Sequence, residues 1–366
     1  PQIQLPKGTT PLEHQVAGHT FQQGTDAIGI LKDQRDGYIL KPAGKPICAE
    51  REIKFYETLE DTQDESLLRL KKFISKYKGT VKMLVNGKQL EFIKLSDATL
   101  GMEQPCIMDI KIGKRTWDPL ATKEKIADEE VKYAMCKKTL GLCIPGFQVY
   151  HLATGKLQRY GKEYGKQLNV ETFKETMRMF LNAENGVWYR PLLVEMLSTL
   201  WAIQKWCRAQ TNYKFYSSSI LLVYDAAKLH TPHDKNNCNS SNGSNIVINS
   251  NTNPSVKNDV KTKTQSNGVT EDIMPIYRKV QRNHSMKNNY DEDMEKIREN
   301  YACMLDSLVG NKYEEENRWV DVKMIDFAHA FPSDDDSLDT NYIFGIDNLV
   351  KIFEQFLKEC DQLKSR

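Results

Sequence analysis

The chain has 366 residues, of which 40% are hydrophobic and 27% are charged, so it can bury a full hydrophobic core in one or two domains. Its formal net charge of +2 excludes a strongly basic nucleic-acid coat but is compatible with a local basic patch. No apolar run approaches the ~20 residues of a membrane span, and the 8 cysteines, which form no C-x-x-C pair, indicate the reduced thiols of an intracellular protein.

An antiparallel sheet is expected within residues 11–41, where short apolar runs are separated by turn residues. Ile28-Gly29-Ile30-Leu31 and Tyr38-Ile39-Leu40-Lys41 flank Asp36-Gly37, a dipeptide typical of tight hairpin turns. The pattern therefore predicts a hairpin whose second strand ends at Lys41.

A helix is expected to begin near Glu50, with apolar residues at 53, 56 and 59 on one face and Glu52 in the first turn. A strand lysine followed by a helix glutamate is the arrangement that kinases use to hold nucleotide phosphates. Lys41 and Glu52 are a candidate pair of this kind. The pattern alone is a weak signal, because lysine and glutamate are also common surface residues.

Residues 92–98 predict a strand that runs into a polar break at Ser96 and Asp97. The break stands just before the next apolar strand, a position that suits a hinge between two lobes. Backbone groups of such a hinge, up to Ala98, could bond an adenine ring. An ordinary loop is the alternative interpretation.

The stretch from Pro105 to Gly113 carries the most specific chemistry in the chain. Its residues Ile107, Met108 and Ile110 are strand formers on a short run bounded by proline and glycine. Because side chains alternate along a strand, Asp109 and Lys111 project from the same face. A carboxylate and an ammonium group are costly on a half-buried face unless something there uses them, although a strand-end ion pair is the commoner explanation for such a pair by itself.

A helix is predicted from Ala121 to Lys138. Its buried face is expected to contain the residues at helical spacing, which are Ala127, Val131, Ala134 and Met135. Lys125 and Lys132 are seven residues apart, within ~20° of each other around a helix and opposite that face, with Asp128 between them. Two aligned lysines usually form a solvated face, but here they are also well placed to meet phosphate groups.

The remaining elements follow from hydrophobic periodicity. They are a strand over 148–151, a polar loop over 157–166, a helix over 191–210 with apolar Leu193, Leu197, Leu200 and Trp201, a strand over 215–225, and a helix over 342–363 with apolar Ile346, Leu349, Val350, Phe353 and Leu357. Between about 230 and 270 the chain is rich in Asn, Ser, Thr and Lys, which predicts a disordered insertion because so little apolar surface cannot offset the entropy of ordering. A basic cluster over 277–287 is either a nuclear-import patch or a solvated helix face.

A second apolar strand with a functional carboxylate is predicted far downstream, at residues 322–327. It ends in Asp326, followed by Phe327. An ionised carboxylate only accepts hydrogen bonds, and hard cations prefer oxygen ligands, so Asp326 is a natural Mg²⁺ ligand. This second motif favours a functional explanation for Asp109 and Lys111 over a simple ion pair.

Together these motifs resemble the inositol polyphosphate kinase family, whose signature is P-x-x-x-D-x-K-x-G. The matching residues are Pro105, Asp109, Lys111 and Gly113 of the signature, Ser218-Ser219-Ile220-Leu221 for the S-S-L-L element and Ile325-Asp326-Phe327 for the I-D-F element. Three motifs in the same order at wide spacing form a specific signal that covers nearly the whole chain. After the signature, Asp118-Pro119 and Glu124-Lys125-Ile126 look most like the multikinase branch of that family.

The resemblance implies an α+β, two-lobed kinase-like fold. The smaller lobe, residues 1–98, would be an antiparallel-sheet lobe that binds nucleotide. The larger lobe, residues 99–366, would be α+β and would contain a helical segment at about 118–138 that binds inositol phosphate.

The resemblance also assigns the site residues. Those expected to bind ATP are Lys41, Glu52, Ser96, Asp97, Ala98, Asp109 and Asp326. Those expected to bind the substrate are Lys111, Lys125, Asp128, Lys132, Lys162 and His329. Asp326 and Ser219 would hold Mg²⁺, and Asp109, Lys111 and Asp326 would be catalytic. Asp109 would either accept the hydroxyl proton or hold the ribose hydroxyls. A serine nucleophile at Ser218-Ser219 is the rival interpretation, but the G-x-S-x-G setting is missing.

The expected function is an ATP-dependent inositol polyphosphate kinase of the multikinase type. By resemblance it would phosphorylate the 3- and 6-hydroxyls of inositol tris- and tetrakisphosphates, with phosphatidylinositol 4,5-bisphosphate left open as a further substrate. The chain lacks G-x-x-x-x-G-K-[ST] and H-R-D, which argues against a P-loop NTPase or an ordinary protein kinase. Another branch of the family (an inositol trisphosphate 3-kinase or an inositol hexakisphosphate kinase) and a non-catalytic scaffold with the same fold are the alternatives. The expected partners are inositol phosphates and phosphoinositide head groups at membranes rather than nucleic acid, for a monomer in the nucleus and cytoplasm.

Overall fold

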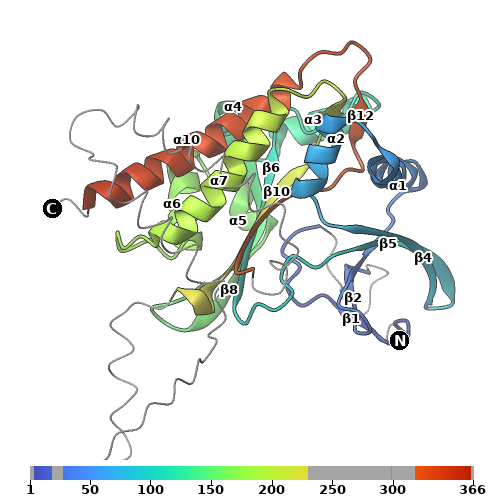
Figure 1. Ribbon diagram of the computed structural model, residues 1–366, viewed down its shortest axis with the longest axis horizontal. Helices are drawn as coiled ribbons and strands as arrows, with labels where there is room; N and C mark the ends of the chain where they lie inside the picture. The colour runs from blue at the N-terminus through green and yellow to red at the C-terminus, as the bar shows by residue number, and fades with distance from the viewer. Residues whose placement is uncertain (1–3, 19–27, 230–297, 299–317, 364–366) are drawn as a thin grey trace, which may run out of the picture. The chain divides into compact units, whose positions relative to one another are not determined.

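The computed structural model describes residues 4–18, 28–229, 298 and 318–363 (Figure 1). The chain divides into two units, Pro1–Leu229 with Leu305–Arg366, and His230–Met304; every helix and strand given below belongs to the first. The predicted insertion and the basic cluster over 277–287 lie outside the described residues. Within the described ranges, no helix combines the length and the apolar character needed to cross a membrane.

The first sheet is antiparallel, with the strand order β1-β2-β3-β5-β4. Its strands are β1 Thr9–Pro11, β2 Leu31–Asp33, β3 Ile39–Pro42, β4 Tyr77–Val85 and β5 Lys88–Leu95. The hairpin predicted around Asp36-Gly37 is confirmed, because β2 pairs with β3 and places Leu31 opposite Leu40. Both leucines belong to the apolar core of this sheet.

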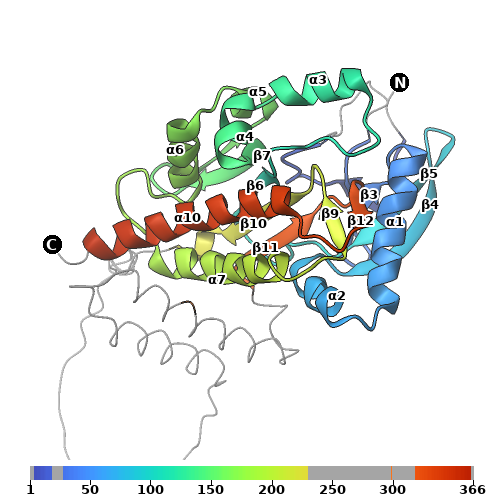
Figure 2. The same cartoon turned by 90° about the horizontal axis from the view of Figure 1, so that it is seen from above.

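Helix α1, Pro46–Asp61, lies beside β3, β4 and β5 (Figure 2). It begins at Pro46 rather than near Glu50, since the fixed φ of proline suits the first position of a helix. The helix buries Glu52 among Phe55, Tyr56 and Leu59. The short helices α2 Glu65–Leu70 and η1 Lys71–Phe73 then lead into β4.

The second sheet has the strand order β11-β10-β6-β7-β8. Its strands are β6 Pro105–Ile112, β7 Leu142–His151, β8 Lys156–Tyr160, β10 Ser219–Asp225 and β11 Val320–Ile325. The apolar stretch that begins at Pro105 is the central strand, and every residue of β6 except Lys111 is buried. The strand predicted before Asp326 is confirmed as β11.

Two long helices cover the second sheet and lie side by side in both views (Figures 1 and 2). They are α7 Arg190–Cys207 and α10 Thr340–Leu363, and all nine apolar residues predicted for their buried faces are buried. The smaller elements are α3 Lys123–Val131, α4 Ala134–Leu140, α5 Lys162–Lys166, α6 Val170–Phe180, η2 Ala226–Lys228 and the two-stranded sheet of β9 Tyr213–Phe215 and β12 Ala330–Pro332. Sheets and helices together form the expected α+β fold.

The single helix predicted over 121–138 is wrong. The chain forms α3 and α4, separated by Lys132 in an extended conformation and by Tyr133 with a left-handed φ of 57°. This break rotates α4 relative to α3, so the buried residues are Cys136, Lys137 and Leu140. The predicted face is not buried: Ala127 is exposed, Ala134 is half-buried, and Val131 and Met135 are 74% and 55% exposed.

Two other predicted elements also differ from the structure. The segment 157–166 is not a loop, because most of β8 and the helix α5 lie in it. Its polar residues suit a strand at the edge of the sheet, where β8 pairs with β7 and with no other strand of the described residues. The strand predicted over 215–225 is interrupted after Phe215, which pairs with Ala330, and resumes at Ser219, which pairs with Lys111. Ser217 turns the chain between them with a φ of 55°.

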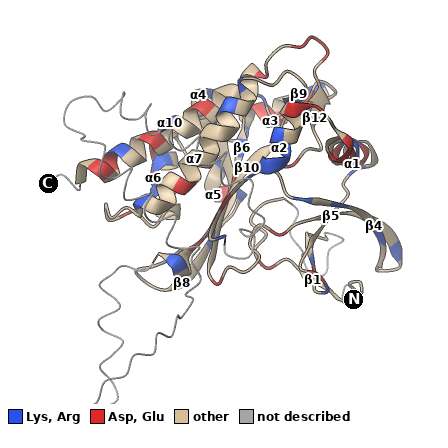
Figure 3. Ribbon diagram, viewed as in Figure 1, with Lys and Arg blue, Asp and Glu red and all other residues tan. Residues whose placement is uncertain are grey.

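The two sheets come from different parts of the chain. All strands of the first sheet precede residue 98, and all strands of the second follow residue 99. The division into lobes of residues 1–98 and 99–366 stays a prediction. Basic and acidic residues are interspersed along α10 rather than gathered separately (Figure 3), in keeping with the net charge near zero.

Candidate functional site

Two charged side chains from the N-terminal part of the chain and one from its C-terminal part meet where the two sheets come together. Lys41 Nζ of β3 lies 2.7 Å from Glu52 Oε1 of α1 and 2.7 Å from Asp326 Oδ1. The side chain of Glu52 is 5% exposed, whereas that of Asp326 is 37% exposed. Glu52 therefore anchors the lysine from inside the protein, and Asp326 remains accessible to a ligand.

The backbone around Asp326 is fixed by further contacts. Glu52 Oε1 also accepts a hydrogen bond from the backbone N–H of Phe327, at 3.1 Å. The hydroxyl of Ser218 donates to the Asp326 carbonyl at 2.7 Å. Asp326 itself has a left-handed φ of 63°, a conformation that costs energy for residues other than glycine. These contacts hold the carboxylate at the end of β11 in one orientation.

The charges of this cluster stabilise one another. Burial lowers the pKa of Lys41, but the carboxylates of Asp326 and Glu52 outweigh that effect and raise it well above its usual range. Burial raises the pKa of Asp326, but Lys41 and Lys111 outweigh that effect and lower it to about 2. Both groups are therefore ionised at neutral pH.

Asp109 and Lys111 lie on β6 within electrostatic reach of this cluster, because Asp326 affects the pKa of Asp109 and Lys111 affects that of Asp326. Lys111 is paired with Ser219 on β10 and with Cys143 on β7, so these side chains share one face of the sheet. Lys111 Nζ donates to the Ser217 carbonyl at 2.9 Å. Burial raises the pKa of Asp109 to about 6, aided by the Asp326 carboxylate and opposed by Lys111.

The site offers oxygen atoms that suit a divalent cation. Asp109 Oδ1 and Ser219 Oγ are buried and make no hydrogen bond of good geometry with a described residue, although Ser219 lies close enough to lower the pKa of Asp109. Asp326 adds a partly exposed carboxylate. In the described part of the chain, no three His, Cys, Asp or Glu side chains cluster as a metal site. Mg²⁺ is commonly held by one or two carboxylates together with substrate phosphates, and these residues fit that requirement.

The predicted hinge is held by its own side chains. Ser96 Oγ accepts a hydrogen bond from the Lys76 N–H at 2.9 Å. The Asp97 carboxylate accepts hydrogen bonds from the Thr99 N–H at 2.8 Å and from Lys32 Nζ at 3.3 Å. Both side chains thus fix the segment, and the main chain through Ala98 is the remaining candidate for contact with a nucleotide base.

His329 follows Asp326 by three residues and contacts Asp118. Its Nδ1 is 2.5 Å from Asp118 Oδ2, and the Asp118 side chain is 7% exposed. Burial lowers the pKa of His329, and the cations Lys125 and Arg51 add to that effect, whereas Asp118 opposes it. The structure therefore brings Lys125 of α3 within electrostatic reach of His329.

Arg51 is a residue that the sequence did not identify. Its Nη1 donates to the Ala328 carbonyl at 2.8 Å, and its guanidinium stacks 4.0 Å above the ring of Phe331. These contacts fix a cation beside His329. The one available signal was its position next to Glu52 in the first turns of α1.

The other residues predicted to bind substrate are separated by the structure. Lys132 follows α3 and forms an ion pair with Glu129 at 3.2 Å. Asp128 is exposed, and Glu129 rather than Asp128 is the acidic residue that contacts Lys132. Lys162 is exposed at the start of α5, and none of the described contacts joins it to the rest of the site.

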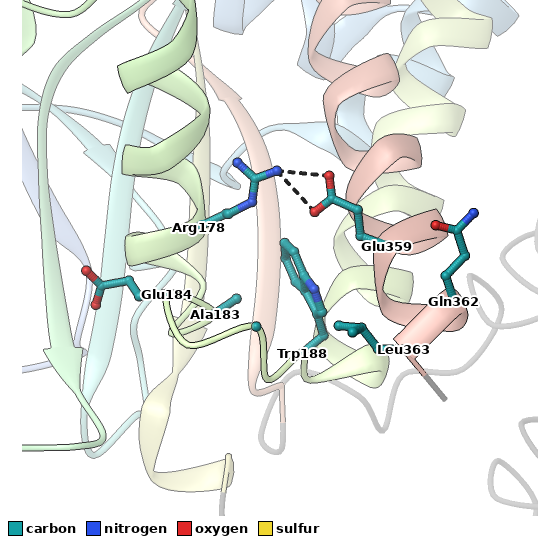
Figure 4. Close-up of a pocket in the computed structure, with 8 residues that line it drawn as sticks. Arg178, Ala183, Glu184, Trp188, Glu359, Gln362 and Leu363 are labelled. Atoms are coloured by element: carbon teal, nitrogen blue, oxygen red, sulfur yellow. Dashed lines mark hydrogen bonds and ion pairs between the residues drawn. The ribbon is translucent and has the colours of Figure 1, made fainter. Parts of the chain in front are cut away.

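A cavity of about 350 Å³ lies between the ends of α6 and α10, apart from these residues (Figure 4). Arg178 points across it to Glu359, with 2.9 and 3.0 Å to the two carboxylate oxygens, beside Trp188. Its lining contains none of the predicted site residues. The cavity therefore is not where the charge cluster of Lys41, Asp109 and Asp326 would bind a ligand.

The chain is similar to several proteins of one family. Inositol polyphosphate multikinases from Homo sapiens and Rattus norvegicus are 30% and 29% identical to it, each over 96% of this chain and over 89% and 93% of their own lengths. Inositol hexakisphosphate kinase 1 from Homo sapiens is 27% identical over 74% of this chain and 54% of its own length.

A solved structure supports the fold independently of close sequence similarity. The crystal structure of the inositol phosphate multikinase Ipk2 from S. cerevisiae, in complex with ADP and Mn²⁺, superposes with a TM-score of 0.52 at 18% identity. The match covers 87% of this chain and 99% of that one. The family model described as inositol polyphosphate kinase matches residues 92–354. Since this match spans most of the chain, and a relative of 30% identity covers 96% of it, the chain belongs to the inositol polyphosphate kinase family.

Proposed function

We propose that the protein is an ATP-dependent kinase of the multikinase type that phosphorylates inositol polyphosphates. The observation that carries the proposal is the meeting of Lys41, Glu52 and Asp326 beside the face that bears Asp109 and Lys111. Phosphoryl transfer requires positioning and charge neutralisation rather than covalent chemistry from the protein, and this cluster supplies fixed charges of both signs.

The nucleotide would bind between the two sheets. Lys41, held by Glu52, would contact the phosphates of ATP, and the main chain at residues 96–98 would contact adenine. Asp326 and Ser219 would hold Mg²⁺. The bound cation would neutralise negative charge on the phosphates.

Lys111 would neutralise the charge that develops on the transferring phosphate. Asp109 would either accept the proton of the attacking hydroxyl or hold the ribose hydroxyls. Its pKa of about 6 supports the first role, because an effective general base titrates near the working pH. A carboxylate with an ordinary pKa would provide less driving force for the proton transfer.

The inositol phosphate would bind beside α3, where Lys125, Lys132, Arg51 and His329 offer cationic or hydrogen-bonding groups. Lys162 is less suited to this role, because it is exposed on a separate helix. We propose the 3- and 6-hydroxyls of inositol tris- and tetrakisphosphates as acceptors, and the head group of phosphatidylinositol 4,5-bisphosphate as a further substrate. We also propose that the protein acts as a monomer in the nucleus and cytoplasm.

The multikinase branch is favoured over the hexakisphosphate kinases by extent of similarity. The multikinases cover 96% of this chain, whereas inositol hexakisphosphate kinase 1 covers 74%. A non-catalytic scaffold is the second candidate. The intact Lys41–Asp326 pair with Asp109 beside it argues against a scaffold, because an ion pair that served only the fold would not need a second carboxylate next to it.

Chromatography of the reaction products would test this function. The protein would be incubated with ATP, Mg²⁺ and, separately, inositol tris-, tetrakis- and hexakisphosphates, with Asp326→Asn as the matched control. We expect new products from the tris- and tetrakisphosphates that carry added phosphates at positions 3 and 6, and a loss of about 10²-fold or more in the control. Products from the hexakisphosphate alone would indicate the other branch, and no product from any substrate would indicate a scaffold.

A further inference from the structure

Glu129 of helix α3 lies next to the lysines that are proposed to bind the inositol phosphate. Lys125 and Glu129 are four residues apart on α3, so their side chains are neighbours on one side of the helix, and Lys132 follows the helix directly. Lys132 Nζ lies 3.2 Å from Glu129 Oε1. A carboxylate therefore contacts one of the two lysines that are proposed to bind phosphate and neighbours the other along the helix.

The Glu129 carboxylate is held in place by neighbouring groups. Its Oε2 accepts a hydrogen bond from Thr116 Oγ1 at 2.8 Å, and Thr116 is 5% exposed. Lys137, which is buried, donates to both Thr116 Oγ1 and the Glu129 carbonyl. An incoming phosphate group cannot push Glu129 aside without breaking its bond to Thr116.

The Glu129 carboxyl group is also ionised at neutral pH. Burial raises its pKa, but the hydrogen bonds from Thr116 and Lys132 outweigh that effect and lower it below the usual value. Glu129 thus has a fixed geometry and a fixed negative charge. It lies in a segment whose lysines are proposed to bind a strongly anionic ligand.

We propose that Glu129 is a specificity-determining residue that limits how many phosphate groups the site accepts. The inference rests on the proposed function and deepens it, because it names the residue that sets the preference among inositol phosphates. A phosphate group that binds Lys132 must share it with Glu129 and is repelled by the carboxylate. The site therefore favours a substrate that presents a hydroxyl, rather than a further phosphate, to this part of α3.

Equilibrium binding of inositol tris-, tetrakis- and pentakisphosphate to the wild-type protein and to Glu129→Gln would test this role. Glutamine keeps the length of the side chain and an oxygen that accepts from Thr116, but it removes the charge. We expect the Kd of the trisphosphate to fall by about 3-fold and that of the pentakisphosphate by about 10-fold or more, since repulsion grows with the charge of the ligand. The ratio of the two Kd values is the decisive quantity.

Glu130→Gln is the matched control. It makes the same change in charge at an exposed position one residue along, ~100° around the helix. We expect its Kd values to equal those of the wild type. Equal effects of the two variants would overturn the inference, because net charge rather than position would then explain them. Glu129→Ala removes the charge in a second way and should shift the Kd ratio in the same direction as Glu129→Gln.

The outcome also separates this inference from the proposed function. If the wild-type protein neither binds nor phosphorylates inositol phosphates, the proposed function is wrong. If it does both, and the ratio of Kd values is unchanged in Glu129→Gln and Glu129→Ala, only the role of Glu129 is wrong. Melting temperatures of the variants would confirm that each one is folded during the titration.

Discussion

At the scale of single residues, the site places two carboxyl groups in opposite electrostatic surroundings. Lys41 and Lys111 lower the pKa of Asp326 to about 2, whereas burial raises that of Asp109 to about 6. Two carboxyl groups with well-separated pKa values can take different roles in one reaction, because one stays ionised while the other can bind and release a proton. Asp326 would stay ionised as a ligand, and Asp109 would be able to take up a proton.

Lys111→Ala should lower kcat by about 10²-fold while changing KM little, because Lys111 would act on charge that develops only in the transition state. Steady-state rates over a range of ATP and inositol phosphate concentrations would measure both constants. A change confined to KM would instead mean that Lys111 binds the ground state and the transition state equally well, and its assigned role would be wrong.

Asp109→Asn should inactivate the protein and yet stabilise it at neutral pH. The folded-state pKa of Asp109 is raised to about 6, so the unfolded chain loses this proton at lower pH than the folded protein does. Stability consequently falls as pH rises from about 4 to about 6, and the wild type carries this penalty fully above that window. The variant lacks the ionisable group and should melt at a higher temperature than the wild type at pH 7.

The two proteins should differ less at pH 4, where the wild-type carboxyl is protonated in the folded state. Thermal melts at both pH values, without nucleotide or metal, would check this. A variant that is less stable than the wild type at pH 7 would mean that the buried Asp109 charge is compensated by groups other than those described.

At the scale of elements, the break between α3 and α4 determines which side chains reach the substrate site. Tyr133 adopts a left-handed conformation, and Lys137 ties the carbonyl end of α3 to Thr116. As a result α3 has no buried residue and presents most of its surface to solvent. The lysines of this segment belong to an exposed helix that is anchored chiefly at its ends.

Lys125→Glu and Lys132→Glu should each raise KM for inositol phosphates and leave KM for ATP unchanged. Each reversal replaces attraction to a phosphate group with repulsion, at an exposed site with an effective dielectric constant nearer ~20 than 4. The effect should shrink as salt rises, because exposed charges are screened. Lys123→Glu, an exposed position on α3 at ~200° from Lys125, is the matched control.

Unchanged KM values in both variants would mean that α3 is only a solvated helix. A rise of equal size in Lys123→Glu would assign the effect to overall charge. Lys132→Glu should have the smaller effect of the two, because Glu129 already offsets part of the charge of Lys132 in the wild type.

At the scale of the whole molecule, Lys41 links the two sheets. It lies on β3 of the first sheet, and its partner Asp326 follows β11 of the second. Glu52 reinforces the link, since its carboxylate bonds both Lys41 and the Phe327 N–H. A nucleotide that contacts Lys41 would therefore stabilise the contact between the sheets as well as its own site.

ATP with Mg²⁺ should raise the melting temperature of the wild-type protein by about 5 °C at 100 times the Kd, because a ligand that binds only the folded state stabilises it by about 2.7 kcal/mol there. Lys41→Met should lose this increase and should also melt at a lower temperature without ligand, since it leaves the buried Glu52 carboxylate without its cation. Lys82→Met, at an exposed position of β4, is the control and should keep the full increase. A full increase in Lys41→Met would remove Lys41 from the nucleotide site.

The sequence by itself determined the features that depend on local pattern. Alternation along β6 placed Asp109 and Lys111 on one face, helical periodicity identified the buried faces of α7 and α10, and the order of the motifs identified the family. These features were predictable because backbone geometry alone sets the period of side-chain directions, two residues in a strand and 3.6 in a helix. This period does not depend on which elements pack against the strand or helix.

Only the tertiary structure decided which charged residues meet. Sequence spacing pointed to Asp128 as the acid between the lysines, but the helix ends at Val131 and Glu129 is the residue that bonds Lys132. Arg51 contacts Ala328 next to His329, and Asp118 contacts His329 itself. Each contact joins segments more than 200 residues apart. Such pairings depend on how distant elements pack and on single backbone dihedrals such as that of Tyr133, and these are fixed by the balance of contacts in the folded protein rather than by any local pattern.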